Sequence, residues 1–422
     1  MARPVAAREA GRYPGGAAVR TVLISLLKRV SLVSALIALL GLSALLTPGS
    51  APTVPAGRPK PTPTPTPTPT PPPGIPVPVS IASDCSVDIT AALNAFIASV
   101  PDGNTVVFAA DGCYRLEQQL LLDQRTNLVL DGNGAELRRT LATPPELQYP
   151  TGNRHINVWG GSGITIRDLK ITGTNTVPDK RAGFGSYLPP YEFDHAIALQ
   201  GVTGATIQDV TIDAVWGDGI FMGQGPTAGT SNVAATNVSI DRNGRQGVSF
   251  SRVAGVVLDN VQLLHSRRSG FDFEPAGPGA SVSNVEIRNS YVKAFLKQVA
   301  GGGLGDVYDI FFHNNTIADS SAPVIEILGP EASDRHGWRF YDNFSPNTLG
   351  YNEAMHFANV DDIDIQRNVF HLSTKGSRES VQFDNAHGAL FVIDNDFLGA
   401  CAPYVANNSD PVIASGNILS IC

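Results

Sequence analysis

A short phrase recurs through most of this sequence: Asn or Asp, an apolar residue, any residue, and a second apolar residue. Eight copies begin at Asn127, Asp168, Asp209, Asn237, Asn260, Asn284, Asp309 and Asp362. A second series of asparagines, Asn289, Asn315, Asn343, Asn368, Asn395 and Asn417, recurs at intervals of 22 to 28 residues. A period in the twenties is typical of solenoids, in which successive coils stack and bury a common core.

Each phrase alternates apolar and polar positions, which is the two-residue period of a half-buried β-strand. A second strand precedes it, as at His195–Leu199, Asp218–Met222, Gln246–Phe250 and Gly270–Phe273. Short strands without an intervening helix predict an all-β fold: a right-handed parallel β-helix of about ten coils, formed by one chain over residues 83–422. We expect the recurring asparagines to stack as a structural ladder between coils about 4.8 Å apart.

An amphipathic segment from Asp88 to Val100 is expected to form a helix that covers the N-terminal end of the core. The chain then enters the coils through Thr105–Phe108 and Cys113–Leu116. The stretch from Asp88 to Gly134 resembles the start of the pectate-lyase-like β-helix proteins, and the repeats from Asp131 to Cys422 are similar to that superfamily's coils. The resemblance implies the fold but no single reaction, because this fold carries lyases, hydrolases, epimerases, phage spikes and adhesins.

The first 82 residues have a different character. An apolar run from Val30 to Leu46 follows several basic residues, so residues 1–50 are interpreted as a signal peptide or an uncleaved signal anchor. Residues 51–82 are predicted to be a linker, because the alternating Pro and Thr of Pro61–Pro73 favour an extended spacer. The β-helix is therefore expected outside the cell, either secreted or anchored to the cell envelope.

Net charge and cysteine content restrict the partners. A formal charge of −8 argues against nucleic acid, whereas a polysaccharide remains compatible with it. Four cysteines, Cys85, Cys113, Cys401 and Cys422, allow three pairings. The pairing of neighbours in the sequence, Cys85–Cys113 with Cys401–Cys422, would staple both ends of the solenoid. No metal site or cofactor is expected, calcium is possible but not indicated, and the protein is predicted to be a monomer.

Alignment of the strands predicts two columns of side chains on one outer face. The first column contains Arg154, His195, Asp218, Gln246 and Ser269. The second contains Asn157, Ala198, Phe221, Ser249 and Asp272, and continues to Glu326, His356 and Gln382. Inner positions of these strands are apolar, so the polar columns are expected to follow a groove.

Three acidic residues of these coils are candidate catalytic groups: Asp218, Asp272 and Glu274. Gly217 and Gly219 flank Asp218 and are expected to leave its carboxylate uncovered. Two coils separate Asp218 from Asp272, which predicts carboxylates roughly 8 to 11 Å apart. That range overlaps the separation in inverting glycosidases, where a water must fit beside the sugar.

Substrate binding is assigned to basic, polar and aromatic residues around this cluster. Arg245 and Arg268 would hold substrate charge, while His195, Gln246, Glu326 and His356 line the columns. Two insertions, residues 138–154 and 173–194, are long for a solenoid, and the second supplies Tyr187 and Tyr191. Long loops often wall a binding groove, where aromatic rings can stack on sugars.

Comparison with known members of the superfamily leaves the reaction open. Polygalacturonase-like hydrolases carry Asp-Asp and Gly-His-Gly on successive coils, whereas this chain has Gly217-Asp218 and Arg245-Gln246-Gly247. Mannuronan epimerases carry Tyr-Gly-Phe-Asp-Pro-His, of which Gly270-Phe271-Asp272 matches only the middle. A convincing set of calcium carboxylates with an Arg base, as in pectate lyases, is not found.

The leading hypothesis is an extracytoplasmic polysaccharide hydrolase in which Asp218 and Asp272 form the acid/base pair and Glu274 assists or replaces Asp272. A lyase or uronate epimerase is the alternative among enzymes, with Arg245 or His195 moving the proton. A non-catalytic carbohydrate-binding or adhesive β-helix is the alternative outside enzymes. Convergent carboxylates with perturbed pKa values would favour an enzyme.

Overall fold

A computed structural model describes residues 74–141, 153–176, 183–318, 323–348, 353–372 and 379–419. The predicted export segment, Val30–Leu46, and the Pro/Thr tract, Pro61–Pro73, lie outside these ranges. Within them, none of the helices has the length and apolar character needed to cross a membrane.

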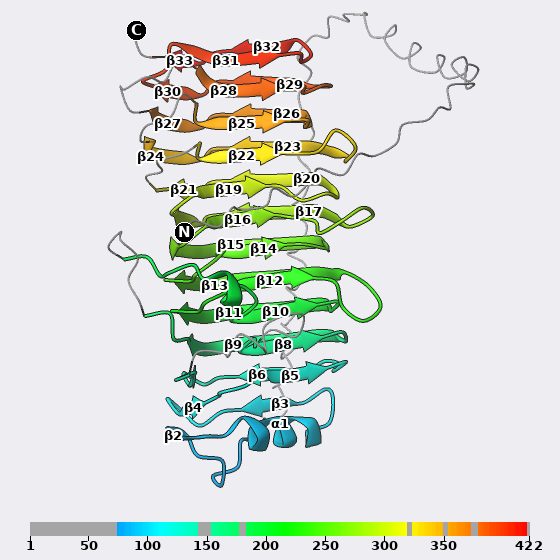
Figure 1. The fold of residues 1–422 in the computed structure, drawn as a ribbon, viewed down its shortest axis with the longest axis vertical. Helices are drawn as coiled ribbons and strands as arrows, with labels where there is room; N and C mark the ends of the chain where they lie inside the picture. The colour runs from blue at the N-terminus through cyan, green and yellow to red at the C-terminus, as the bar shows by residue number, and fades with distance from the viewer. Residues whose placement is uncertain are drawn as a thin grey trace, which may run out of the picture. The chain divides into compact units, whose positions relative to one another are not determined.

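Parallel strands stack in coils along one axis, with the N-terminal helix at one end (Figure 1). One sheet, here sheet B, contains eleven of the described strands, about one more coil than predicted. They are β5 (Leu120–Asp123), β8 (Ile156–Trp159), β10 (Ile197–Gln200), β12 (Ile220–Gly223), β14 (Val248–Phe250), β16 (Ser269–Phe273), β19 (Lys297–Gly301), β22 (Ile325–Leu328), β25 (Met355–Ala358), β28 (Glu379–Asp384) and β31 (Ala402–Asn407). The predicted parallel β-helix is confirmed.

The other described strands form sheet A, which contains 22 of them. In chain order they are β1 (Ile75–Pro76), β2 (Asp84–Asp88), β3 (Thr105–Val107), β4 (Cys113–Arg115), β6 (Val129–Asp131), β7 (Glu136–Arg138), β9 (Ser162–Thr172), β11 (Thr203–Asp213), β13 (Thr230–Asp241), β15 (Val253–Ser266), β17 (Ser281–Arg288), β18 (Tyr291–Ala294), β20 (Asp306–His313), β21 (Thr316–Ile317), β23 (Arg335–Tyr341), β24 (Phe344–Thr348), β26 (Asp361–Gln366), β27 (Val369–Leu372), β29 (Leu390–Ile393), β30 (Asp396–Leu398), β32 (Val412–Ser415) and β33 (Ile418–Leu419). Leu, Ile, Val and Phe side chains from both sheets fill the space between them.

The strands of sheet A bend at residues with positive φ, where Gly, Asn and Asp are favoured. In β11 the two bends lie at Gly204 (φ 72°) and Asp209 (φ 53°). The recurring phrase occupies the first bend at Asn127, which aligns with Gly163, and the second bend from Asp168 to Asn260. It returns to the first bend from Asn284 onward, because Ala254 pairs with Ser283 and Asp259 with Arg288. The phrase that looks uniform in the sequence therefore marks two different bends.

A buried ladder of asparagines joins the C-terminal coils. The Oδ1 atom of Asn343 accepts hydrogen bonds from the backbone N–H of Asn315 at 3.0 Å and from its Nδ2 at 3.1 Å. The pattern repeats through Asn368, Asn395 and Asn417. This confirms the predicted ladder from Asn315 onward, but its first position is Ser290, whose N–H donates to Asn315. Asn289 points outward and donates to Asp259, so its assignment to the ladder was wrong.

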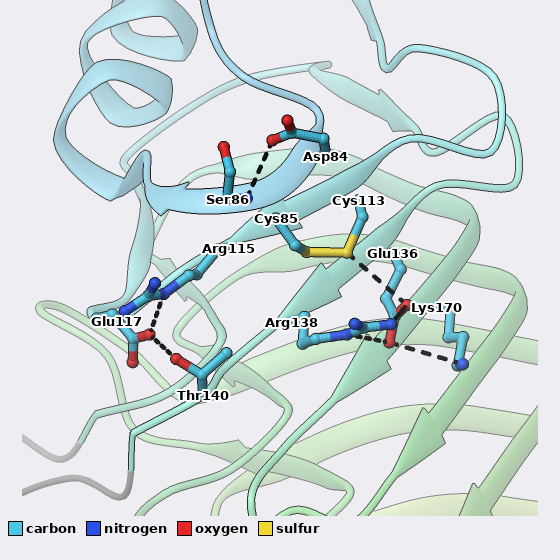
Figure 2. The surroundings of a disulfide bond; sticks show 10 residues. All are labelled: Asp84, Cys85, Ser86, Cys113, Arg115, Glu117, Glu136, Arg138, Thr140 and Lys170. Carbon is cyan, nitrogen blue, oxygen red and sulfur yellow. Dashed lines mark hydrogen bonds and ion pairs between the residues drawn. A yellow bond between two sulfur atoms is a disulfide. The ribbon is translucent and has the colours of Figure 1, made fainter.

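The N-terminal end is closed by a helix and a disulfide. Helix α1 (Thr90–Ser99) buries Leu93 and Ile97 against the first coil, as predicted. Figure 2 shows the predicted Cys85–Cys113 bond between β2 and β4, with Cα atoms 5.0 Å apart. β1 pairs with β3, so the described fold includes residues before Ser83. Cys401 is not a free thiol, and its expected partner Cys422 lies outside the described residues.

Candidate functional site

The outer face of sheet B carries both predicted columns. Strand register aligns the second column as Asn157, Ala198, Phe221, Ser249, Asp272, Ala300, Glu326, His356 and Gln382, which confirms the prediction and adds Ala300. The first column is three residues earlier, where backbone hydrogen bonds connect the segments around His195, Asp218, Gln246 and Ser269. Asp218 and Asp272 therefore belong to coils two steps apart, as predicted.

Asp218 is completely buried, so the expectation of an uncovered carboxylate was wrong. The flanking glycines serve close backbone packing instead: a Cβ on Gly217 would lie 2.8 Å from the Glu192 carbonyl oxygen, and one on Gly219 would lie 2.8 Å from the Gly247 carbonyl oxygen. Burial raises the pKa of Asp218, while the Arg245 guanidinium opposes that shift.

Arg245 is the centre of the cluster and contacts three carboxylates. Its Nη1 lies 2.9 Å from Asp218 Oδ2, and its Nη2 lies 3.0 Å from Glu274 Oε2. Its Nε lies 3.7 Å from Glu192 Oε2, beyond hydrogen-bond distance. The backbone N–H of Gln246 completes the shell of Asp218 at 2.9 Å from Oδ1. A buried carboxylate and its cation are thus compensated locally.

Asp272 lies at the edge of this network. Its residue is 6% exposed, and Gln246 Nε2 donates to its Oδ2. Gln246 Oε1 in turn accepts the N–H of Ser269 at 2.9 Å, which fixes the amide orientation. Burial, reinforced by the Glu274 charge, raises the pKa of Asp272 to about 7. Glu274 is open, with 46% of its side chain exposed, so a buried acid and an exposed carboxylate lie on one strand end.

The second insertion extends over this cluster. Tyr187 donates to Glu192 Oε2 at 3.0 Å, and Arg268 lies over the Tyr187 ring at 5.1 Å from its centroid. Further along, the ring of Phe184 makes edge contacts with His265 and Phe295 at centroid distances of 5.1 and 5.8 Å. The 3₁₀ turn η2 (Pro189–Tyr191) places Tyr191 against Trp216 at 5.2 Å, away from the carboxylates. Residues 142–152 of the first insertion lie outside the described ranges.

His195 is enclosed beside Asp218. Its Nδ1 accepts the backbone N–H of Asp218 at 3.0 Å, and its ring stacks on Phe221 at a centroid distance of 4.9 Å. Burial, followed by the charges of Arg154 and Arg245, holds the pKa of His195 well below its usual range. His195 is therefore a neutral acceptor that orients the Asp218 backbone.

Glu326 and His356 lie farther along the same face, on β22 and β25, and no contact described in the structure links them to Arg245. Glu326 pairs with Lys297 at 2.9 Å, and His356 Nε2 lies 2.8 Å from Asp384 Oδ2. The structure thus places most of the predicted site residues, together with neighbouring side chains, in two groups. The first group, the enclosed cluster, comprises Glu192, Asp218, Arg245, Gln246, Asp272 and Glu274. The second, the open cluster, comprises Lys297, Glu326, Glu353, His356, Gln382 and Asp384.

Sequence reasoning missed Glu192, Lys297, Glu353 and Asp384. Lys297 continues the first column, because it pairs with Ser269. Glu353 follows the register of the first column and could have been found by extending that column, and Asp384 lies two residues after Gln382 on β28. Glu192 belongs to an insertion, whose path no repeat predicts. In the described ranges, no group of three or more His, Cys, Asp or Glu side chains is arranged to hold a metal ion.

Comparison with known proteins places this architecture. Residues 154–329 match the family model described as the right handed beta helix region. The match agrees with the observed architecture, so the chain contains a right handed beta helix region and has the parallel β-helix fold. No curated protein matches it by sequence.

Three solved structures illustrate the range of this fold. The surface adhesin PfbA of Streptococcus pneumoniae is 12% identical, with 76% of this chain and 88% of the adhesin covered at a TM-score of 0.53. A Family 28 exopolygalacturonase of Yersinia enterocolitica is 13% identical over 80% of this chain and 76% of that enzyme, at 0.50. The A-module of the Azotobacter vinelandii mannuronan C-5 epimerase AlgE6 is 14% identical over 81% and 98%, at 0.50. These similarities establish the fold, which an adhesin, a hydrolase and an epimerase share.

Proposed function

We propose that this protein is a glycoside hydrolase that cleaves a polysaccharide outside the cytoplasm, with its active site at the enclosed cluster. The observation that carries the proposal is the pairing of Asp272, a buried carboxyl whose pKa is raised to about 7, with the exposed carboxylate of Glu274 two residues later. One acid kept protonated near neutral pH beside one exposed carboxylate is the arrangement that glycoside hydrolysis needs.

The proposed reaction uses this pair in one displacement. Asp272 donates its proton to the glycosidic oxygen, and Glu274 accepts a proton from the water that attacks the anomeric carbon. The Cα atoms of positions i and i+2 of a strand lie roughly 6.6 to 6.8 Å apart, so side chains directed to the same face can place their carboxyl groups within the range of about 6.5 to 9.5 Å for inverting enzymes. Both carboxyl groups then return to their starting states by proton exchange with solvent. We therefore propose inversion at the anomeric carbon.

Asp218 has a positioning role in this proposal. Its burial keeps it from the sugar, but its two contacts with Arg245 Nη1, at 2.9 and 3.2 Å, fix the guanidinium. Arg245 then holds Glu274 at 3.0 Å. Asp218 was the predicted partner of Asp272; its enclosure transfers the role of base to Glu274.

Two alternatives make different demands on the same residues. A lyase or epimerase needs a base close to the sugar, whereas His195 is buried and Arg245 is held by carboxylates that raise its pKa. A non-catalytic carbohydrate-binding β-helix is favoured by the near-complete burial of Asp218, Gln246 and His195, which could serve stability alone. Export would follow from the predicted segments at residues 1–50 and 51–82, either by secretion or by anchoring.

Activity of the purified protein on pectins, alginate, xylans and neutral glucans would test the proposal. Reducing ends and the ultraviolet absorbance of unsaturated uronates are followed together, with Asp272→Asn and Glu274→Gln as variants. We expect reducing ends without unsaturation, lost in both variants. Unsaturated product would assign a lyase, and binding without any cleavage would leave a carbohydrate-binding protein.

A further inference from the structure

We infer that the outer face of sheet B at the enclosed cluster takes uncharged sugars and disfavours uronates, an inference that rests on the proposed function and names its substrate class. The sequence alone left the opposite expectation open, since Arg245 and Arg268 would suit a uronate carboxylate. The contacts of Arg245 argue against the first of these arginines as a uronate site, and the charge of the surrounding face argues against the second. A carboxylate ligand needs free guanidinium donors, usually two parallel ones.

Arg245 has few donors left for a substrate. Asp218 takes Nη1 through both of its oxygens, and Glu274 takes Nη2 at 3.0 Å. Glu192 lies on the remaining side, with its Oε2 atom 3.7 Å from Nε. A uronate would have to displace one of these carboxylates or approach between two of them. Both routes place like charges together, which lowers affinity.

The outer face of sheet B beyond Arg245 carries a net negative charge. From β10 to β28, the described side chains of this face include eight carboxylates: Glu192, Asp218, Asp272, Glu274, Glu326, Glu353, Glu379 and Asp384. Three basic side chains oppose them there, Arg245, Arg268 and Lys297, and Arg154 of the first column adds a fourth beside His195. Lys297 is already paired with Glu326 at 2.9 Å. Even with Asp272 protonated, a negative excess remains along the path of a bound chain. Such a field repels a polyanion over its whole length.

Uncharged sugars find suitable partners here. Phe221 lies on the outer column between Ala198 and Ser249, half-buried, with His195 stacked on its ring. Tyr187 is also half-buried above the cluster. Aromatic rings accept the apolar faces of sugar rings, and carboxylates accept hydrogen bonds from sugar hydroxyls. This face therefore offers stacking surfaces and acceptors, which match a neutral polyol better than an anion.

Matched pairs of polymers that differ in charge test the inference. Binding of the purified protein is measured by affinity gel electrophoresis with polygalacturonate and its methyl ester, and with carboxymethylcellulose and hydroxyethylcellulose. Cleavage is measured on the same four polymers by reducing ends. We expect the uncharged member of each pair to bind at least about tenfold more tightly.

Tighter binding of the charged members would overturn the inference and leave the hydrolase proposal intact. Binding without cleavage would overturn the hydrolase proposal, while the charge preference would still decide the inference. Absence of binding to all four would overturn both.

A charge variant addresses the role of Arg245. Glu192→Gln removes the carboxylate that faces Arg245 Nε and should shift the binding ratio toward the charged polymers by about threefold or more. The control is Glu286→Gln on β17 of sheet A, which removes one charge from the other sheet. It should leave the ratio unchanged. Equal shifts in both variants, or no shift in Glu192→Gln, would contradict the inference that the carboxylates around Arg245 set the charge preference.

Discussion

The enclosed and open clusters lie along one face of the β-helix and both combine carboxylates with a basic side chain, yet only the first contains buried carboxyl groups. Asp218 and Asp272 have 0% and 6% of their residue surfaces exposed, whereas the side chains of Glu326 and Asp384 are 25% and 32% exposed. The second insertion lies at the enclosed cluster, where its Glu192 faces Arg245 and its Tyr187 donates to Glu192.

Enclosure changes the chemistry of these carboxyls. The pKa of Asp272 is raised to about 7 because burial disfavours its charge. The pKa of Asp384 is lowered, because hydrogen bonds from Asn407, His356 and Gln382 outweigh its partial burial. A β-helix face can therefore hold either a proton donor or an ordinary ion pair, depending on which loop covers it.

The largest contrast is expected in activity. Asp272→Asn should lower kcat/KM on a cleaved polysaccharide by about 10² to 10⁴-fold, because the proton donor is lost. Glu326→Gln in the open cluster should change kcat/KM by less than about threefold. Both variants would be assayed by reducing ends at neutral pH. Comparable losses in the two variants would show that the clusters are not functionally distinct.

The second largest contrast between the clusters is expected in the free energy of unfolding. Arg245→Met leaves Asp218 buried without its cation, and breaking such a pair costs roughly 3 to 5 kcal/mol of unfolding free energy. Lys297→Met removes a partly exposed ion pair and should cost about 1 kcal/mol or less. Denaturant unfolding of the purified variants measures both. The double variant Arg245→Met/Asp218→Asn should recover part of the loss; recovery of nothing would argue against an uncompensated Asp218 as its cause.

The pH dependence of stability should have opposite signs in the two clusters. The folded pKa of Asp272 is about 7 against 3.8 for an ordinary Asp, so its contribution is full below about pH 4 and is lost as the pH rises to about 7. Relative to Asp272→Asn, the wild type should lose a few kcal/mol over this interval, since a tenfold change in proton affinity corresponds to about 1.4 kcal/mol.

Asp384 should behave in the reverse way. Its lowered pKa stabilises the fold above the ordinary value of 3.8, and this contribution is lost as the pH falls through the folded pKa. Relative to Asp384→Asn, the wild type should gain a small amount of stability as the pH rises. Unfolding at a series of pH values checks both slopes, and slopes of equal sign would contradict the difference in enclosure.

The smallest effect is expected on KM, from a change at Phe184, which attaches the second insertion to the coils. Phe184 contacts His265 and Phe295, and Phe184→Ala should loosen the loop without touching the carboxylates. We expect KM to rise a fewfold with little change in kcat, measured on the same substrate. The control is Phe344→Ala, which removes an exposed ring on β24 of sheet A. A large fall in kcat with unchanged KM would place Phe184 in another role.

Periodic features were predictable from the sequence. Strand alternation and coil spacing fix which residues are neighbours, so the column through Ser249, Asp272, Glu326 and His356 follows from the pattern alone. The capping helix and the Cys85–Cys113 bond are local to the first coils and were also foreseen.

Two features were not predictable in the same way. The phrase beginning at Asn260 aligns with Asn289 and not Asn284, because both bends of a coil favour the same residue types. Asp218 is enclosed by Arg245 and His195, and the Glu192 carbonyl oxygen packs against the neighbouring Gly217 from an insertion without a repeat. Whether other segments cover a side chain depends on the tertiary structure. The glycines that flank Asp218 therefore led to the wrong prediction of an uncovered carboxylate.

The most direct test of this account is the titration of Asp272 in the unliganded protein. Side-chain carboxyl resonances from ¹³C-labelled Asp would be followed between pH 3 and pH 9, with Asp272→Asn identifying the signal. The account predicts that this carboxyl titrates near pH 7, well above Asp384 of the open cluster, whose pKa is lowered. Titration near pH 4 would show that Asp272 is ionised at neutral pH and would contradict its role as the proton donor.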